Sequence, residues 1–254
     1  MNRKDKINII REKMAAGEAS IGSWIQIPHA SVAEIMGQAG YDWVAVDLEH
    51  GSISSHQLPD LFRALELGGT LPLARLAQGT SKDCKQALDA GAGGVIIPMV
   101  SNAKQLEIVV DAACWPPKGN RGVGFSRANL FGKNFVEYHK EAQSPFIAAQ
   151  IEHINAVDNL EEILAVRGLD AIFIGPYDLS ASMGLMAQFD HSDYRAVISK
   201  ILNLSNENQI PTGIHIVSPI TSDLKRSLDE GYQFIAYSID TVLLNTAAKF
   251  PKID

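Results

Sequence analysis

The sequence predicts one α/β domain, a (β/α)8 TIM barrel spanning residues 1–254, on three observations. Short, almost uninterrupted apolar runs recur eight times, as in a parallel sheet covered on both faces. An amphipathic helical pattern follows each run, and eight such units in about 250 residues match a closed barrel. No linker or low-complexity segment divides the chain.

The eight expected strands are apolar segments bounded by turn residues. They are residues 21–27, 43–47, 71–76, 94–100, 146–151, 171–175, 212–216 and 234–238. The expected helices show the spacing of apolar residues that gives a helix one buried face. They are residues 31–38, 55–67, 81–89, 103–113, 156–166, 193–208, 222–229 and 241–250. A further amphipathic helix is expected at the N-terminus.

Glycines mark several of the junctions from helix to strand. Examples are the segments AGY at 39–41, LGGT at 67–70 and DAGAGG at 89–94. Because glycine readily adopts the left-handed conformation that ends a helix, these positions support the boundaries. The alternative is a doubly wound open sheet, which would be expected to carry a glycine-rich phosphate loop after its first strand. Here that strand is followed by IPHA at 27–30, which favours the barrel.

The composition excludes several classes of partner and site. A net charge of −7 and a pI near 5.5 argue against general binding to nucleic acid or to an anionic membrane surface. The N-terminal segment lacks the apolar core of a signal peptide, and no apolar run of about 18 residues occurs, so a cytoplasmic protein without membrane contact is expected. Cys84 and Cys114 lack metal-ligand spacing and are expected to be packing residues.

One segment, residues 115–135, is too long and irregular for an ordinary loop of a barrel. It contains the run WPPKGNRGVGFSRANLFGK, with two prolines and four glycines. Loops of this length in compact domains are usually functional or disordered. Its polar residues and aromatic side chains favour a loop at the active site or at a contact between subunits.

Polar side chains collect at the expected carboxyl ends of the strands, where the chemistry of a barrel is assembled. They include Gln26, His29, Asp47, Glu49, His50, Arg75, Gln150, Glu152, Asp178, His215, Ser238 and Asp240. Glu152 and Asp178 follow adjacent strands, and two carboxylates this close suit a hard divalent cation such as Mg²⁺ or Mn²⁺ better than zinc. Two alternatives remain open: the pair serves as helix and turn caps, or as a general acid and base.

Four segments together resemble the metal-dependent class II pyruvate aldolases of the HpcH/HpaI family. They are DLEHG at 47–51, ARL at 74–76, RGVGFSRAN at 121–129, and the specific block QIEHINAVDNLEEILAVRGLDAIFIGPYDLSASMG at 150–184. The resemblance covers nearly the whole chain. It implies a barrel, a divalent metal (Mg²⁺ or Mn²⁺, with Co²⁺ as a further candidate), a pyruvate enolate intermediate and a homo-oligomer, specifically a hexamer built as a trimer of dimers.

The resemblance also implies roles for individual residues. Glu152 and Asp178 are similar to the metal ligands, and Arg75 to the cation that stabilises the enolate. His50 with Asp47 resembles the acid/base pair, in which Asp47 would hold the tautomer of the imidazole. The remaining candidates bind substrate: Gln150 by resemblance, the backbone N–H groups that follow Gly175 and Pro176 as partners of a carboxylate, and Tyr177 at the pocket wall.

The expected reaction is the reversible cleavage of a 4-hydroxy-2-oxo acid, of the 2-dehydro-3-deoxy sugar acid or hydroxy-oxo diacid type, to pyruvate and an aldehyde. The strand ends offer no lysine for a Schiff base, which favours metal-dependent chemistry. Leu48, Gly51-Ser52 and Tyr177 depart from the family pattern, so no particular substrate is carried over. Two other classes stay open: a related enolate lyase, such as an acyl-CoA (citrate lyase β-like) lyase or a decarboxylase, and a barrel without catalytic activity.

Overall fold

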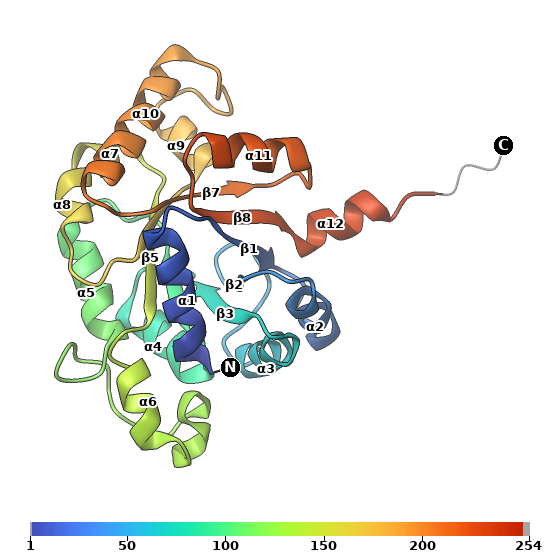
Figure 1. Cartoon of the computed structure of the whole chain (residues 1–254), viewed down its shortest axis with the longest axis vertical. Helices are drawn as coiled ribbons and strands as arrows, with labels where there is room; N and C mark the ends of the chain where they lie inside the picture. The colour runs from blue at the N-terminus through green and yellow to red at the C-terminus, as the bar shows by residue number, and fades with distance from the viewer. Residues whose placement is uncertain (1, 251–254) are drawn as a thin grey trace.

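The computed structural model describes residues 2–250, and in this range eight parallel strands close into a barrel in chain order, β1 to β8 (Figure 1). The predicted fold class is therefore confirmed. The strands are β1 (Ser20–Ile25), β2 (Trp43–Asp47), β3 (Leu71–Arg75), β4 (Gly94–Ile97), β5 (Phe146–Ile151), β6 (Ala171–Ile174), β7 (Thr212–Ile216) and β8 (Phe234–Ile239). Each overlaps the apolar run from which it was predicted.

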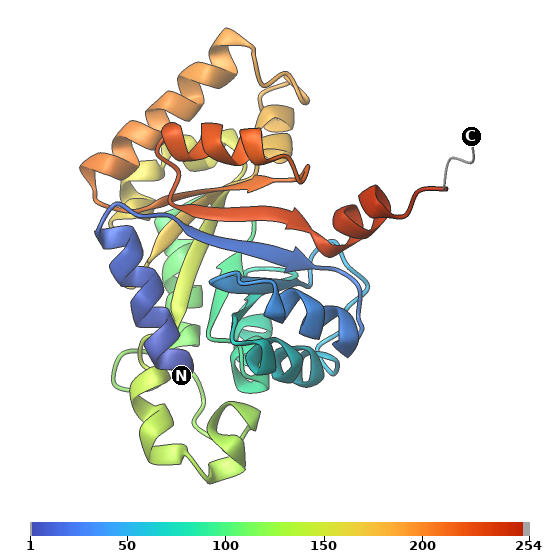
Figure 2. The same ribbon diagram turned by 45° about the vertical axis from the view of Figure 1, so that its right-hand side comes forward.

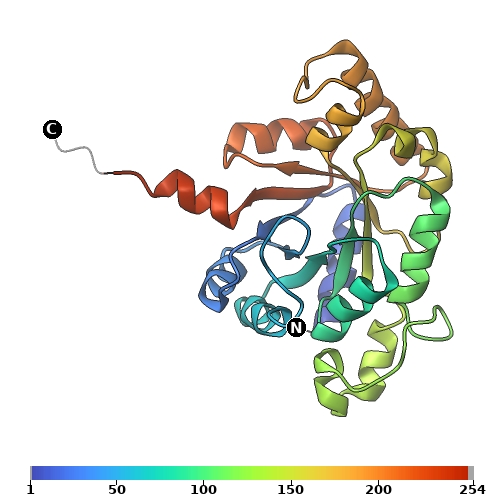
Figure 3. The ribbon, with the colours of Figure 1, turned by 180° about the vertical axis from the view of Figure 1, so that it is seen from behind.

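Helices surround this barrel (Figures 1 and 3). They are α1 (Arg3–Ala15), α2 (Ala30–Gln38), α3 (Leu58–Gly68), α4 (Ser81–Ala90), α5 (Ala103–Ala113), α6 (Phe135–Glu141), α7 (Ile154–Asp158), α8 (Leu160–Leu164), α9 (Pro176–Ser182), α10 (Ser192–Glu207), α11 (Thr221–Asp229) and α12 (Asp240–Ala247), with the 3-10 segment η1 (Arg127–Gly132). The expected helix at 156–166 is divided at Asn159, whose side chain donates to the Ser101 carbonyl. The short helix α9 is not among the helices expected from the sequence.

The interior of the barrel is filled by aromatic side chains. Trp43 stacks on Phe234 with ring centroids 4.4 Å apart, and Trp24 meets the edge of Phe173 at 5.6 Å. A side chain at position 22 would collide with the Trp43 ring, so the glycine there gives the indole its space. The same apolar cluster includes buried residues of α1, which therefore closes the N-terminal end of the barrel. The carboxyl ends of the strands form the opposite end.

The second core lies between the barrel and its outer helices and consists mainly of Ile, Leu, Val and Ala side chains. Cys84 is part of it, and both cysteines are buried and free, as expected of packing residues. Among residues 2–250, no helix is long and apolar enough to cross a membrane.

Two segments extend beyond this compact body (Figure 2). The first is a lobe formed by η1 and α6 within residues 115–142, fastened by buried Arg127, which pairs with Glu66 of α3. The second is α12, which leaves the barrel directly after β8 and points away from it (Figures 1 and 3). Leu244 of α12 remains 59% exposed, so the barrel does not cover the apolar face predicted for this helix.

Candidate active site

The ends of β2 and β3 place an aspartate directly beside an arginine. Asp47 is the register partner of Arg75 in the parallel ladder between these two strands. Arg75 donates from Nε to Oδ1 of Asp47 over 2.8 Å and from Nη2 to Oδ2 over 2.6 Å. This two-point contact fixes the plane of the guanidinium, as is typical of arginine with a carboxylate.

The Asp47 carboxylate is fully buried and accepts three further hydrogen bonds. The donors are Gln26 Nε2 at 2.9 Å and the backbone N–H groups of Glu49 and His50 at 3.0 and 3.3 Å. Burial alone would raise the pKa of Asp47, but the bonds and charge of Arg75, together with the other donors, hold that pKa below its ordinary value. Asp47 therefore stays ionised at neutral pH.

The expected contact between Asp47 and the imidazole of His50 is not formed, and this expectation needs correction. From His50, Asp47 accepts the backbone N–H and makes no bond to the imidazole, because its oxygens are already occupied by Arg75 and Gln26. The His50 side chain is 58% exposed, and its Nε2 lies 3.9 Å from Oε2 of Glu49. Any carboxylate that orients the ring in this structure is thus Glu49, not Asp47.

Glu152 lies immediately after β5, with 4% of its surface exposed. Its Oε1 accepts from the backbone N–H of Met99 at 2.6 Å, and its Oε2 accepts from Gln150 Nε2 at 2.9 Å. A Cβ at Gly175 would come within 2.6 Å of Oε2, so this glycine leaves the space in which the carboxylate lies. Burial and the negative charges of Glu49 and Asp178 together raise the pKa of Glu152 to about 7, against the opposing effect of the Met99 N–H.

The capping alternative is not observed for either carboxylate. The cap of α7 is His153, whose Nδ1 accepts from the Asn155 N–H at 3.1 Å, so Glu152 has no capping role. Asp178 is exposed in the first turn of α9, and its side chain makes no hydrogen bond within the described part of the chain. The turn that follows is held instead by Ser180, which donates to the Tyr177 carbonyl.

The residues at this site fit a hard divalent cation. Glu152 carries a buried charge that neighbouring carboxylates disfavour, which is a conflict that a bound cation relieves. Gln150 turns its Nε2 toward Glu152, so its buried Oε1 has no hydrogen-bond partner among residues 2–250. Across the same residues, no three His, Cys, Asp or Glu side chains form a metal-binding group. The protein would thus supply two carboxylates and leave positions for water and substrate.

Two participants were missed in the sequence. Trp24 lies under Arg75, with the guanidinium carbon 4.7 Å from the ring centroid. Met99 has a φ of +51° and presents its backbone N–H to Glu152. Trp24 looks like any core residue of a strand, and a backbone donor leaves no mark in the sequence, so no local pattern could have identified either.

His215, at the end of β7, packs inside the barrel against Trp24, with ring centroids 5.7 Å apart. Its Nε2 lies 3.2 Å from the Ser238 carbonyl oxygen. Burial lowers the pKa of His215 to about 4, against the opposing effect of that hydrogen bond. The ring is therefore neutral at pH 7, with the Nε2 proton donated to the carbonyl.

Tyr177 lies at the edge of the site and is half-exposed. Its ring meets the edge of Phe189 at 5.2 Å, and both line a cavity of about 740 Å³ between α9, α10, α11 and β7. This packing places the ring against Phe189, in the segment just before α10. The expected contact of its hydroxyl with a substrate stays a prediction.

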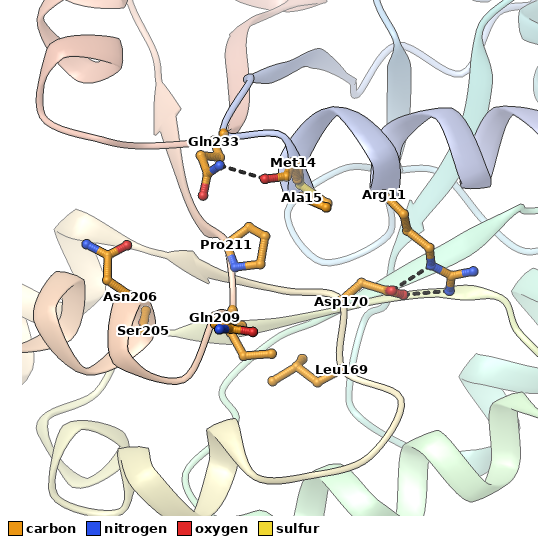
Figure 4. A pocket seen from close by; sticks show the side chains of 12 residues that line it. Arg11, Met14, Ala15, Leu169, Asp170, Ser205, Asn206, Gln209, Pro211 and Gln233 are labelled. Carbon is orange, nitrogen blue, oxygen red and sulfur yellow. Dashed lines mark hydrogen bonds and ion pairs between the residues drawn. The ribbon is translucent and has the colours of Figure 1, made fainter.

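A cavity of about 610 Å³ lies at the other end of the barrel, near α1 and the end of α10 (Figure 4). Its two charged residues pair with each other: Arg11 donates to both Asp170 oxygens, at 2.7 and 2.9 Å. The Nε2 of Gln233 donates a hydrogen bond to the Met14 carbonyl. The cavity therefore has no charged group left over for catalysis, unlike the strand ends.

Comparison with known proteins identifies relatives along almost the whole chain. Residues 20–247 match the family model for HpcH/HpaI aldolase/citrate lyase. A hydroxypyruvate/pyruvate aldolase from Roseobacter denitrificans is 36% identical over 247 residues, covering 94% of each chain. A 2-keto-3-deoxy-L-rhamnonate aldolase from Escherichia coli K12 is 35% identical, covering 94% of this chain and 90% of the relative. The crystal structure of an HpcH/HpaI aldolase/citrate lyase family protein from Burkholderia cenocepacia superposes with a TM-score of 0.88 at 29% identity, covering 94% and 96% of the chains.

Proposed function

Because this chain belongs to the HpcH/HpaI aldolase/citrate lyase family, we propose that it catalyses the reversible aldol cleavage of a 4-hydroxy-2-oxo acid to pyruvate and an aldehyde. The similar relatives from R. denitrificans and E. coli are both named aldolases. The observation that carries the proposal is the combination of a buried, incompletely neutralised carboxylate, Glu152, with a rigidly held guanidinium, Arg75, at the strand ends. That combination suits an enolate, which needs cationic stabilisation.

Glu152 and Asp178 are the residues that would hold a divalent cation, Mg²⁺ or Mn²⁺, with Co²⁺ as a further candidate. Both offer carboxylate oxygens, the ligands that these hard ions prefer. When bound, such an ion makes the methyl protons of a 2-oxo acid more acidic by Lewis-acid stabilisation of the enolate. Gln150 places its free Oε1 beside Glu152 and orients the substrate.

Arg75 stabilises the negative charge that develops on the enolate oxygen. Its plane is fixed before substrate arrives, by Asp47 at one edge and Trp24 below. A donor oriented in advance needs no reorganisation during the reaction, and one such donor is typically worth about 3 kcal/mol at the transition state. The backbone N–H groups after Gly175 and Pro176, at the start of a helix without a side-chain cap, hold the substrate carboxylate.

His50 is the base that removes the proton of the 4-hydroxyl group as the C3–C4 bond breaks. Its position at the exposed rim suits contact with the aldehyde half of the substrate. Asp47 supports it through the backbone N–H of His50, and Glu49 lies nearest to the ring. Burial raises the pKa of Glu49, against the opposing charges of Arg75 and His50.

The alternative acyl-CoA lyase would need a basic groove for the phosphates of coenzyme A. The basic residues of the segment 115–135 are Lys118, Arg121, Arg127 and Lys133. Arg121 and Arg127 are both buried, and Arg127 is already paired with Glu66. The two lysines that remain exposed do not make a phosphate groove, which favours the small 2-oxo acid substrate.

The test is exchange of the pyruvate methyl protons with D₂O, followed by NMR, with and without aldehydes. We expect exchange that EDTA abolishes and that Mg²⁺, Mn²⁺ or Co²⁺ restores, and carbon–carbon bond formation when an aldehyde is added. Full exchange in the metal-free enzyme would contradict the metal assignment. Exchange of the methyl protons of acetyl-CoA, with none for pyruvate, would favour the acyl-CoA lyase.

We further propose that the chain forms a homo-oligomer, with the hexamer of the family resemblance as the expected form. Two exposed apolar surfaces support this. One, on the lobe, comprises Val123, Phe125, Leu130, Phe131 and Val136; the other lies on α12 around Leu244. Apolar surface of this kind normally marks a contact with another chain, and closed symmetry is the usual result.

Light scattering at micromolar concentration should give a multiple of the 27.6 kDa mass of one chain. Replacing Leu244 by aspartate should lower that mass, because a charge cannot be buried cheaply in an apolar contact. The matched control is Leu67→Asp on α3, an exposed leucine outside both surfaces. A mass of one chain for the unmodified protein would contradict the proposal, and an unchanged mass for Leu244→Asp would exclude α12 from the contact.

A further inference from the structure

A chain of hydrogen bonds connects the first turn of α12 with the candidate site. Thr241 Oγ1 donates to Gln26 Oε1 at 3.3 Å, and Gln26 Nε2 donates to Oδ2 of Asp47 at 2.9 Å. That same Oδ2 accepts from Arg75 Nη2 at 2.6 Å. Gln26 is the residue that follows β1, so it links α12, the last described helix, with β2 and β3.

The backbone of Gln26 is held from the same helix. Asp240, the first residue of α12, is buried and accepts the N–H of Gln26 at Oδ1 and the N–H of Ile27 at Oδ2, each at 2.9 Å. Its Oδ1 also accepts the N–H of Thr241 at 2.7 Å. Both the main chain and the side chain of Gln26 are therefore positioned by two consecutive residues at the base of α12.

The Gln26 amide can take only one orientation between its two partners. Its NH₂ group faces the ionised carboxylate of Asp47, and its carbonyl faces the hydroxyl of Thr241. Turning the amide over would place its oxygen against the carboxylate, which is repulsive. A glutamine can bind Thr241 through its carbonyl and Asp47 through its NH₂ group at the same time, and so relates the position of one to the other. A side chain with only donors or only acceptors could not bind both in this way.

We infer that Gln26 is a positioning residue that couples the base of α12 to Arg75 through Asp47, an inference that rests on the proposed aldolase function. Without the Gln26 bond, Oδ2 of Asp47 keeps Arg75 Nη2 as its one donor among the described residues, while Oδ1 is still held by Arg75 Nε and by the backbone N–H groups of Glu49 and His50. The carboxylate can then tilt at its Oδ2 end about the fixed Oδ1. Arg75 follows that tilt because its Nη2 binds the same Oδ2 as Gln26. The direction of the guanidinium toward the enolate therefore depends on how α12 is anchored.

The experiment measures pyruvate methyl-proton exchange in Gln26→Leu, which removes both bonds while keeping a similar volume. We expect a fall in kcat of about tenfold with KM changed less than about twofold, since Arg75 acts on the enolate more than on the bound ketone. Thr241→Val, which removes only the hydroxyl, should lower kcat about threefold, and Thr241→Ser should recover most of that loss. The matched control is Thr246→Val, at an exposed position further along α12.

The decisive comparison is made in an Arg75→Lys background. If Gln26 acts through the arginine fork, Gln26→Leu should have little further effect there, because the fork is already absent. Equal losses in both backgrounds, or a raised KM with unchanged kcat, would overturn the inference. A crystal structure of Gln26→Leu gives an answer independent of activity: a displaced Arg75 guanidinium supports the coupling even if the enzyme proves to have another substrate, and an unmoved one refutes it.

Discussion

Glu152→Gln should lower pyruvate turnover at least about a thousandfold while the protein remains folded. The substitution keeps the shape of the side chain and its hydrogen bond to Met99. It removes the charge proposed to hold the cation, and it replaces the acceptor of the Gln150 Nε2 bond by a donor. A bound divalent ion contributes several kcal/mol to an enolate, so its loss has an effect of this size. Proton exchange measures turnover, and calorimetric titration with Mn²⁺ measures binding.

The stability of Glu152→Gln should change in the opposite direction. Because the folded-state pKa of about 7 lies above the ordinary value of 4.5, the native state prefers the protonated form of Glu152. Its stability contribution is fully present below pH 4.5 and is lost as the pH rises to 7. At pH 8 the metal-free Gln variant should therefore be more stable than the parent, by roughly 3 kcal/mol for a shift of this size.

The control for this prediction is Glu161→Gln, an exposed carboxylate on α8, which should alter neither activity nor stability. Two results would refute the assignment of Glu152. One is normal turnover with bound metal in the Gln variant. The other is a variant that is inactive only because it has unfolded, which thermal unfolding monitored by circular dichroism reveals.

Arg75→Lys should lower kcat about a hundredfold and raise KM by less than about fivefold. Lysine keeps the positive charge but cannot reproduce the two parallel contacts with Asp47 at 2.8 and 2.6 Å. Its ammonium group is therefore not held in a fixed orientation toward the enolate oxygen. The loss corresponds to about 3 kcal/mol of transition-state stabilisation, as for an oriented oxyanion donor. Steady-state kinetics of aldol cleavage separates the two parameters.

Arg63→Lys provides the matched control, because Arg63 is an exposed residue of α3 that pairs with Asp60, one turn earlier in the same helix. Its substitution should leave both kinetic parameters within twofold. An unchanged kcat with a raised KM in Arg75→Lys would instead show that Arg75 binds the ground state, and would remove it from the role of enolate stabiliser.

The barrel and the places of its strands could be predicted because each strand is a local apolar run, independent of distant residues. What could not be predicted depends on contacts between segments. The division of one helix at Asn159 depends on a bond to Ser101, 58 residues earlier. The direction of α12 is determined by where it is anchored after β8, and no periodicity within the helix encodes that direction.

In the candidate site, too, local features could be predicted and contacts between segments could not. The sequence identified the residue types at the strand ends, including Asp47, Glu152 and Arg75. It did not identify their partners: the pairing of His50 with Asp47 came from the family resemblance. The partner of Asp47 is decided by the β2–β3 register, which puts it opposite Arg75 and uses the oxygens that His50 would have needed.

The packing of α1 and the aromatic residues inside the barrel has a kinetic consequence. Because these side chains fill the interior and close its N-terminal end, the barrel is open at the carboxyl ends of the strands, and both products of cleavage must leave from that end. Glu152 lies at the buried side of that opening and His50 at the exposed rim. With His50 as the proposed base, the aldehyde would form next to it, between the pyruvate and solvent. We therefore expect sequential departure, in which the aldehyde leaves first and pyruvate is the last product on the enzyme.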